Sequence, residues 1–263
     1  MVIKRKNDSN AERKIDMKSI SKLSLTILLI TTHAALAVEN ANFWDDKTTL
    51  CMYQMLKDTH DICTSAGLTY WIDFGTMLGA IRHGGIIPWD DDMDIAIDQA
   101  DASVFESLKP TFAALGYEII PFFFGYKIFP ADGQPYEHEG KLYNFKTPYL
   151  DVFLTFVKDG KVFYTSPSWG NRGEFKLYKT LDELFPLQDY QFGALVVKGS
   201  NDPSLYFNAF YGSNWYDVAK VRSYHPNKVI AGKTFTLKEE DRVPAFPVEP
   251  LEDRFTALSA FEG

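Results

Sequence analysis

The sequence predicts an α+β fold, a mixed β-sheet flanked by helices in a single domain. Segments with helical periodicity and short apolar strands follow one another without strict alternation, which disfavours a doubly wound fold. The 263 residues are 46% hydrophobic and 15% aromatic, enough to bury a full core. One domain of roughly 200 to 220 residues plus an N-terminal extension fits this length.

The first half of that domain predicts helices around two buried strands. An apolar stripe indicates a helix over 45–65, and Gly67 follows at the usual position of a helix C-cap. A strand is expected over 68–72, then a short helix that begins at Gly75-Thr76 and ends near residue 82. After a second strand at 95–97, a helix is expected over 101–115, with its N-cap at residue 101 and its stop at residue 116.

The second half predicts mainly strands. Two short aromatic strands are expected within 117–130, followed by a polar loop over 134–148. A strand over 149–157 leads through a turn at Asp159-Gly160 into a hairpin partner at 161–164. The remaining expected elements are a strand pair near 194–197, a helix over 203–211 and an irregular tail over 226–263.

The N-terminal segment is unlike the rest of the chain. The first 22 residues hold seven basic and three acidic side chains, so the remainder carries a net charge of -12. An acidic body argues against nucleic-acid binding. A basic stretch, an apolar run over 23–37 and the small-x-small ending Ala35-Leu36-Ala37 are typical of a signal peptide. We expect residues 1–37 to direct the chain into a secretory route, either cleaved or kept as a membrane anchor, with 38–225 as the main folded domain.

Residues 88–97, PWDDDMDIAI, are the most informative stretch. Because alternate strand side chains share a face, Asp92 and Asp94, with Asp90, are expected to project together away from the core. Asp91 is then expected to stand outside this set. Clustered carboxylates repel one another unless a cation or a shared proton compensates, and Mg²⁺ is held by carboxylates plus substrate phosphates. The stretch therefore predicts a metal and phosphate site.

Two other interpretations apply to the same acids. An acidic run in a chain of net charge -8 is also typical of a solvated loop. An EF-hand would use positions 90, 92 and 94, but Ile95 stands where its turn needs glycine and Asp101 where a bidentate glutamate is expected. The EF-hand is excluded on these grounds.

Two further segments favour the metal and phosphate site. Asp151 interrupts the apolar strand LDVFL, where an acid must be paired or ligated to be tolerated. Gly75 and Thr76 lie at a strand-to-helix turn, where free backbone N–H groups favour a phosphate. Either feature alone is also common in proteins without such a site.

Residues 70–97, YWIDFGTMLGAIRHGGIIPWDDDMDIAI, resemble the LicD family, which includes bacterial phosphocholine transferases and the fukutin-related proteins. The resemblance continues at 150–156 (LDVFLTF), 184–187 (LFPL), the strand at 192–197 and 211–215 (YGSNW). It implies a nucleotidyltransferase-like fold. It also implies transfer of a phosphorylated alcohol, such as phosphocholine or ribitol phosphate, from a CDP-linked donor to a glycan hydroxyl, with release of CMP.

The resemblance also implies roles for individual residues. Asp92, Asp94 and Asp151 would be catalytic, with Asp151 as a metal ligand or as the base for the acceptor proton. The ion would be Mg²⁺ (or Mn²⁺), and its ligands Asp90, Asp92, Asp94 and Asp151. Donor-binding residues would be Gly75 and Thr76 at the phosphates, and the cationic Arg82, His83 and Lys127.

The sequence leaves three alternatives open, which concern the reaction, the membrane and the role of the aromatic residues. A glycosyltransferase with a D-x-D motif would use a nucleotide sugar, and a catalytically silent secretory accessory protein would keep the fold without the reaction. Residues 23–37 could hold the protein at a membrane. Aromatic residues between 122 and 146 could line an acceptor or choline pocket, although a packed aromatic core is the more common outcome.

Overall fold

The computed structural model describes residues 41–166, 178–226, 228–246 and 250–259. The expected signal or anchor segment, 1–37, lies outside these residues. The described residues belong to one compact unit, Ala41–Gly263. No helix in the described ranges combines the length and the apolarity that crossing a bilayer requires.

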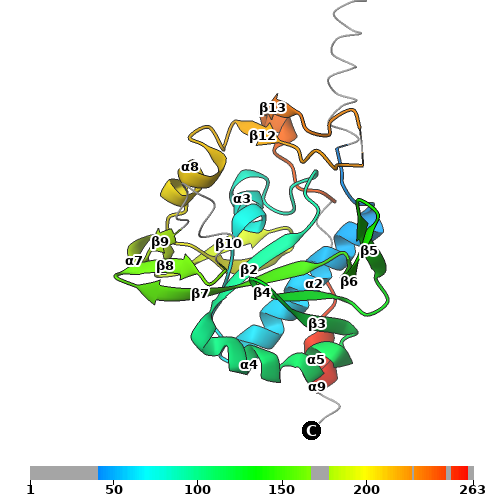
Figure 1. Cartoon of the computed structure of the whole chain (residues 1–263), viewed down its shortest axis with the longest axis vertical. Helices are drawn as coiled ribbons and strands as arrows, with labels where there is room; N and C mark the ends of the chain where they lie inside the picture. Colours follow the sequence, from blue (N-terminus) through cyan, green and yellow to red (C-terminus); the bar gives the residue numbers. More distant parts are fainter. Residues whose placement is uncertain (1–40, 167–177, 227, 247–249, 260–263) are drawn as a thin grey trace, which may run out of the picture. The chain divides into compact units, whose positions relative to one another are not determined.

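The core of the fold is a mixed sheet with the strand order β1-β2-β7-β4-β3, extended from β7 through β8 to β9 (Figure 1). Strands β2 and β7 pair in parallel, whereas the other neighbours are antiparallel, which confirms the predicted sheet class. The strands are β1 (Tyr70–Ile72), β2 (Met93–Asp98), β3 (Tyr117–Phe122), β4 (Gly125–Pro130), β7 (Leu150–Lys158), β8 (Lys161–Tyr164) and β9 (Tyr178–Thr180).

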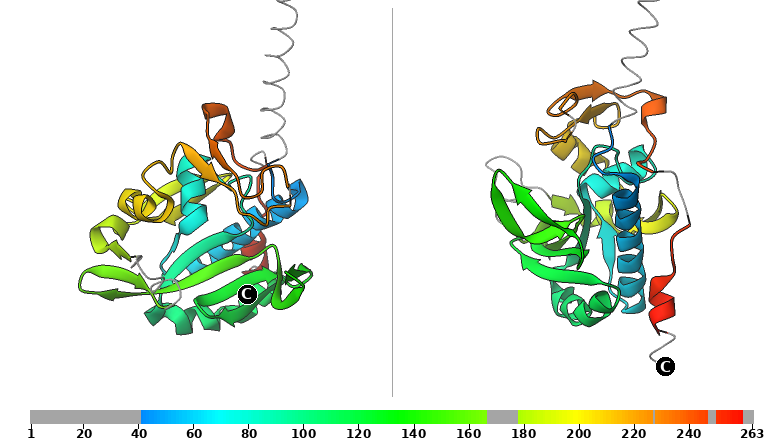
Figure 2. Two further views of the ribbon diagram at one scale, coloured as in Figure 1. Left: turned by 45° about the horizontal axis from the view of Figure 1, so that its top comes forward. Right: turned by 90° about the vertical axis from the view of Figure 1, so that its right-hand side faces the viewer.

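Helix α2 (Asp46–Ser65) runs along one face of this sheet, as the right-hand view of Figure 2 shows. Its N-cap is Asp45, whose side chain accepts a hydrogen bond from the Thr48 N–H. Met52, Leu56 and Ile62 share its buried stripe, and burying each contributes about 1.5–3 kcal/mol. The predicted helix is confirmed at both ends.

Helix α3 (Phe74–Arg82) follows β1 directly and also begins at an aspartate N-cap, Asp73. The remaining helices are α4 (Ala102–Ser107), α5 (Lys109–Ala114), α7 (Leu181–Leu184), α8 (Ser204–Tyr211) and α9 (Arg254–Ser259), with 3-10 turns η1 (Gln99–Asp101) and η2 (Glu239–Asp241). Three hairpins complete the fold: β5 (Gln134–His138) with β6 (Lys141–Thr147), β10 (Gln188–Phe192) with β11 (Leu195–Gly199), and β12 (Val218–Lys220) with β13 (Thr234–Thr236).

Three predictions about these elements were wrong. The helix expected over 101–115 is divided into η1, α4 and α5, with Pro110 at the start of α5, and Asp101 makes no capping bond. Residues 134–148 form the β5–β6 hairpin rather than a loop, because three of their aromatic side chains pack inward. The stretch after 225 contains β13, η2 and α9, and Arg254 of α9 binds Asp58 of α2.

Candidate active site

Three charged side chains lie in one row across the sheet. The parallel register places Asp94 of β2 opposite Asp151 of β7, and the antiparallel register places Asp151 opposite Lys127 of β4. Side chains that are directly opposite project to the same face. Lys127 Nζ lies 2.5 Å from Asp151 Oδ1, and both side chains are buried. The prediction that an acid within this apolar strand must be paired is confirmed.

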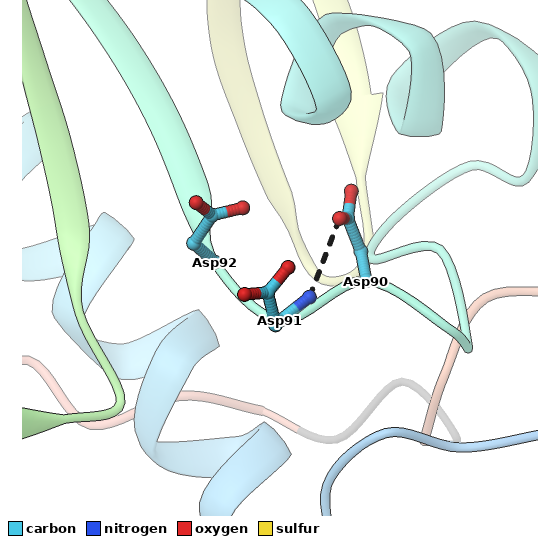
Figure 3. A group of neighbouring side chains, drawn as sticks. All are labelled: Asp90, Asp91 and Asp92. Carbon is cyan, nitrogen blue, oxygen red and sulfur yellow. Dashed lines mark hydrogen bonds between the residues drawn. The ribbon is translucent and has the colours of Figure 1, made fainter. Parts of the chain in front are cut away.

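The loop before β2 brings more carboxylates to the same place. One ligand oxygen from each of Asp92, Asp94 and Asp151 lies within 4.8 Å of the others, and the same holds for Asp90, Asp91 and Asp92. Figure 3 shows the three loop carboxylates on one side of the loop, with the Asp91 N–H donating to Asp90 Oδ1 at 3.3 Å. Asp92 belongs to both groups and so links the four acids predicted as metal ligands, whereas Asp91 shares a group only with Asp90 and Asp92.

The start of α3 holds this acidic strand in place. The Asp94 N–H donates to Thr76 Oγ1 at 2.7 Å, and the Gly75 N–H donates to Asp94 Oδ2 at 3.1 Å. A Cβ at Gly75 would lie 2.5 Å from Asp90 Oδ2. Glycine is required there because the Asp90 carboxylate packs against its backbone. Gly75 thus contacts the carboxylates, whereas Thr76 is buried and holds the backbone of Asp94.

A cavity of about 190 Å³ opens over the carboxylates. Asp90, Asp92, Asp94 and Asp151 line it together with Gly75. Its other walls include cationic side chains (Arg82, Lys220 and Arg222), aromatic ones (Phe74, Trp89, Phe153, Phe210 and Tyr211) and aliphatic ones (Leu78, Ile87 and Val218). The cavity therefore combines carboxylates that could bind a metal ion with arginine and lysine side chains that could bind a phosphate.

The acids of this cavity are difficult to ionise together. Burial, with repulsion from neighbouring carboxylates, raises the pKa of Asp90 to about 6 and the pKa values of Asp92 and Asp94 well above 3.8. Burial also raises the pKa of Asp151 to about 6, although the Lys127 ammonium opposes the increase. A bound divalent cation would relieve this repulsion.

The residues predicted as cationic donor contacts have different surroundings. Arg82 lines the cavity, and its Nη1 donates to the Trp215 carbonyl at 2.8 Å. Burial lowers the pKa of Arg82 to about 10, so it stays charged at neutral pH. His83 is buried against Trp89, and burial together with the Arg82 charge lowers its pKa to about 3. The expectation that His83 supplies a positive charge is therefore wrong, because its imidazole is neutral at pH 7.

Lys127 is likewise held away from the cavity. Besides its bond to Asp151, its ammonium lies over four aromatic rings, at 3.8 Å from the ring centre of Tyr149 and 4.5 Å from that of Phe145. The other two rings belong to Phe122 and Phe124. Lys127 can act on the cavity only through the carboxylate that it binds.

Arg222, a cation that contacts the acidic loop, was not predicted from the sequence. Arg222 Nε lies 3.3 Å from Asp91 Oδ1, and Arg222 Nη2 lies 4.0 Å from Asp92 Oδ1. Tyr224 also donates to both carboxylate oxygens of Asp91, at 3.2 and 3.1 Å. The Asp-Asp-Asp run was the available signal for Asp91, whereas neither periodicity nor a motif pointed to Arg222 or Tyr224.

A second buried ion pair was also missed. Asp73, the N-cap of α3, accepts bonds of 2.6 Å from Lys179 Nζ and from the Tyr164 hydroxyl. Its Oδ1 also accepts from the Phe74 N–H at 2.9 Å. Asp73 and Lys179 are both buried. This pair fixes the helix whose first turn carries Gly75 and Thr76.

The fold and the site together define a nucleotidyltransferase-type domain. The model of the LicD/FKTN/FKRP nucleotidyltransferase domain matches residues 67–202. An uncharacterized protein of Rickettsia prowazekii is 35% identical over 222 residues, which span 81% of this chain and 76% of that protein. The chain belongs to the LicD/FKTN/FKRP family of phosphotransferases.

Two relatives with named activities match over shorter stretches. The human ribitol 5-phosphate transferase FKRP is 40% identical over 63 residues, covering 22% of this chain and 13% of that protein. The lipopolysaccharide cholinephosphotransferase LicD of Haemophilus influenzae is 50% identical over 36 residues, covering 14% of each. These matches therefore concern only a part of each relative.

Two solved structures match part of the chain at low TM-scores. ANT(2″)-Ia bound to adenylyl-2″-tobramycin has a TM-score of 0.33 and 14% identity, over 56% of this chain and 67% of that one. The lincosamide adenylyltransferase LnuA has a TM-score of 0.35 and 18% identity, over 59% and 85%.

Proposed function

We propose that this protein transfers a phosphorylated alcohol from a CDP-linked donor to a hydroxyl group of a glycan and releases CMP. The observation that carries the proposal is the convergence of Asp92, Asp94 and Asp151 within 4.8 Å, beneath a cavity that Arg82 and Arg222 also line. The relatives named as ribitol 5-phosphate transferase and cholinephosphotransferase support this reaction class.

The acids fit a magnesium or manganese ion. All of the converging groups are carboxylates, which are hard oxygen ligands of the kind that Mg²⁺ and Mn²⁺ take. Asp92 and Asp94 would hold the ion, with Asp90 beside them, and Asp151 stays available for the acceptor proton. When bound, a divalent ion would neutralise part of the charge on a pyrophosphate and polarise its phosphorus.

The cations of the cavity bind the donor. Arg82, Lys220 and Arg222 line it alongside the acids, so a pyrophosphate seated there meets positive charge from the protein. Phosphoryl transfer depends mainly on such positioning and charge neutralisation. Arginine also suits the task because its planar guanidinium can bind two phosphate oxygens at once.

Asp151 is the proposed base. Its Oδ1 accepts the Lys127 bond, which leaves Oδ2 to take the proton of the acceptor hydroxyl. The acceptor oxygen then forms a bond to the phosphorus that carries the alcohol. The bond from that phosphorus to the bridging oxygen breaks, and the bridging oxygen leaves with CMP. The proton later passes from Asp151 to solvent.

A screen of CDP-choline, CDP-ribitol and CDP-glycerol for CMP release tests the proposal. With Mg²⁺ present, we expect CMP from at least one donor, a loss of that release with EDTA, and recovery when Mg²⁺ is added back. Phosphorus should appear on the glycan product. Release of a nucleoside diphosphate from a nucleotide sugar would instead support a glycosyltransferase.

We also propose that residues 1–37 direct the chain into a secretory route. The proposal rests on the basic start, the apolar run over 23–37 and the small residues that follow it. Fusion of this segment to a reporter that is active only after export tests it. A reporter that stays in the cytoplasm would contradict the proposal.

A further inference from the structure

A second cavity, of about 260 Å³, adjoins the acidic loop on the side of the β5–β6 hairpin. Its residues come from β5, from the end of β6 and the residue before β7, from the segment before α2, and from the stretch around Tyr224. Asp91 lines this cavity, whereas its neighbours Asp90 and Asp92 line the first one. Adjacent residues of one loop thus serve two cavities, which places the second beside the proposed reaction centre.

The two cavities differ in their chemistry. Among the described residues that line the second cavity there is no lysine or arginine, whereas the first has three such residues. Most of its wall consists of rings, which belong to Phe43, Trp44, Tyr136, His138, Tyr149 and Tyr224. Its carboxylates are those of Asp91 and Glu137. This composition disfavours a pyrophosphate and favours a ligand without negative charge.

The rings are held in a fixed arrangement. Tyr136 and His138 lie nearly parallel, at 15°, and the ring of Tyr224 meets that of His138 at 73° with centroids 5.6 Å apart. The hydroxyl of Tyr224 is anchored on the carboxylate of Asp91, and the Trp44 indole N–H donates to the Asp91 carbonyl at 3.0 Å. The polar ends of Tyr224 and Trp44 therefore point at the acidic loop.

Two nearby cations weaken the attraction of this cavity for an organic cation, and the Glu137 carboxylate remains as a hydrogen-bond acceptor in its wall. The charge of Asp91 is already compensated by Arg222, at 3.3 Å. Behind the wall, the ammonium of Lys127 lies 3.8 Å from the ring centre of Tyr149. That ring is already engaged by one cation, and a second positive charge beside it would be repelled. Aromatic rings in this arrangement would otherwise suit a quaternary ammonium group, but the Lys127 ammonium already contacts one of them, Tyr149.

We infer that this cavity is the acceptor subsite and holds one sugar ring. The C–H faces of a sugar ring are apolar and pack on aromatic faces, while its hydroxyl groups donate to carboxylates. The volume is below the ~300–1,000 Å³ of typical drug-sized pockets, which suits a single ring. A donor in the first cavity and an acceptor in the second would meet across the acidic loop. The attacking and leaving oxygens must lie roughly in line on opposite sides of the phosphorus, so the acceptor and the CMP part of the donor need separate binding sites.

Saturation-transfer NMR with the full chain and methyl glycosides of glucose, galactose and N-acetylgalactosamine tests this inference. Tyr136→Ala and His138→Ala each remove one wall of the cavity, and each should weaken glycoside binding by about fivefold, the value of one aromatic contact. Leu142→Ala is the matched control, because Leu142 lies on the same hairpin, is 65% exposed and does not line the cavity. Binding that is unchanged in both wall variants would overturn the inference. Loss of tetramethylammonium binding instead of glycoside binding would overturn it as well.

The subsite's role as an acceptor site rests on the proposed function. Calorimetry with CDP and Mg²⁺ on the same samples tests donor binding separately from sugar binding. Both wall variants should bind CDP within about twofold of the parent, because no change is made in the first cavity. A parent chain that binds glycosides but not CDP would contradict the proposed donor while leaving the sugar site intact. A parent that binds CDP but no glycoside would contradict the sugar site alone.

Discussion

Lys127 and Asp151 face each other across the β4–β7 pair, with Nζ 2.5 Å from Oδ1 and both side chains buried. Asp151 in turn lies opposite Asp94 on β2. The ammonium therefore compensates only one of two adjacent buried carboxylates. The negative charge of Asp94 is therefore left for a bound cation to compensate.

Replacing Lys127 by Met leaves Asp151 buried without its partner. We expect the free energy of unfolding to fall by about 3–5 kcal/mol, the usual cost of breaking a buried pair from one side. Urea denaturation measures the loss. The exposed pair of Lys198 and Asp189 is the control, since Lys198→Met should cost less than about 1 kcal/mol. Equal costs for the two variants would show that the buried pair does not stabilise the fold.

Asp92→Asn and Asp94→Asn should each abolish turnover while the protein stays folded. Each change removes a charged ligand and also relieves repulsion among buried acids, so the melting temperature should stay equal or rise. CMP release and thermal denaturation are measured together. Asp98→Asn serves as the control, because Asp98 caps η1 at the far end of the same strand. Full activity in both site variants would exclude the carboxylates from the reaction.

The stability of the metal-free protein should increase as the pH falls from about 7.5 to about 5.5. The pKa values of Asp90 and Asp151 are raised to about 6 in the folded chain, against 3.8 for the ordinary group. These two groups, together with Asp92 and Asp94, bind more protons in the folded than in the unfolded state, so their contribution to stability falls as the pH rises. His60 and His83 have lowered pKa values and act in the opposite direction, but they are two groups against four. Mg²⁺ should restore stability at the higher pH and have less effect at the lower one, where protons compete. Thermal denaturation with and without EDTA measures both trends, and a stability that falls on acidification would contradict them.

Gly75→Ala should impair catalysis more than folding. The added Cβ would lie 2.5 Å from Asp90 Oδ2, so the carboxylate must turn away from the cavity. We expect at least about a tenfold loss of kcat/KM, equivalent to 1.4 kcal/mol of transition-state stabilisation. Gly140→Asn in the open β5–β6 turn is the control, since asparagine tolerates the positive φ of 74° there. Unaltered kinetics in Gly75→Ala would show that the position of Asp90 is not critical.

Local patterns were sufficient to predict the acidic half of the site. Strand alternation paired Asp92 with Asp94, and the same rule singled out Asp151 within an apolar strand. Helix α2 and its cap were predictable because periodicity and capping act over a few residues. These features depend on near neighbours in the chain.

The cationic half was not predictable in this way. Arg222 and Tyr224 lie where the chain has neither helical nor strand periodicity, and their positions follow from contacts with the distant Asp91. The β5–β6 hairpin was mistaken for a loop because most of its outward side chains are polar, while Tyr136, Tyr143 and Phe145 belong to a small cluster apart from the main core. His83 was misjudged because its burial depends on tertiary packing.

The β2–β7 register has a consequence for the order of events in folding. Asp94 and Asp151 meet only after the long stretch between them has closed, and such distant contacts form late and slowly. Until that stretch has closed, the β2–β7 register does not hold the two acids side by side. An ion that needs the assembled site stabilises interactions formed after the rate-limiting step. It should therefore slow unfolding while leaving the rate of folding nearly unchanged.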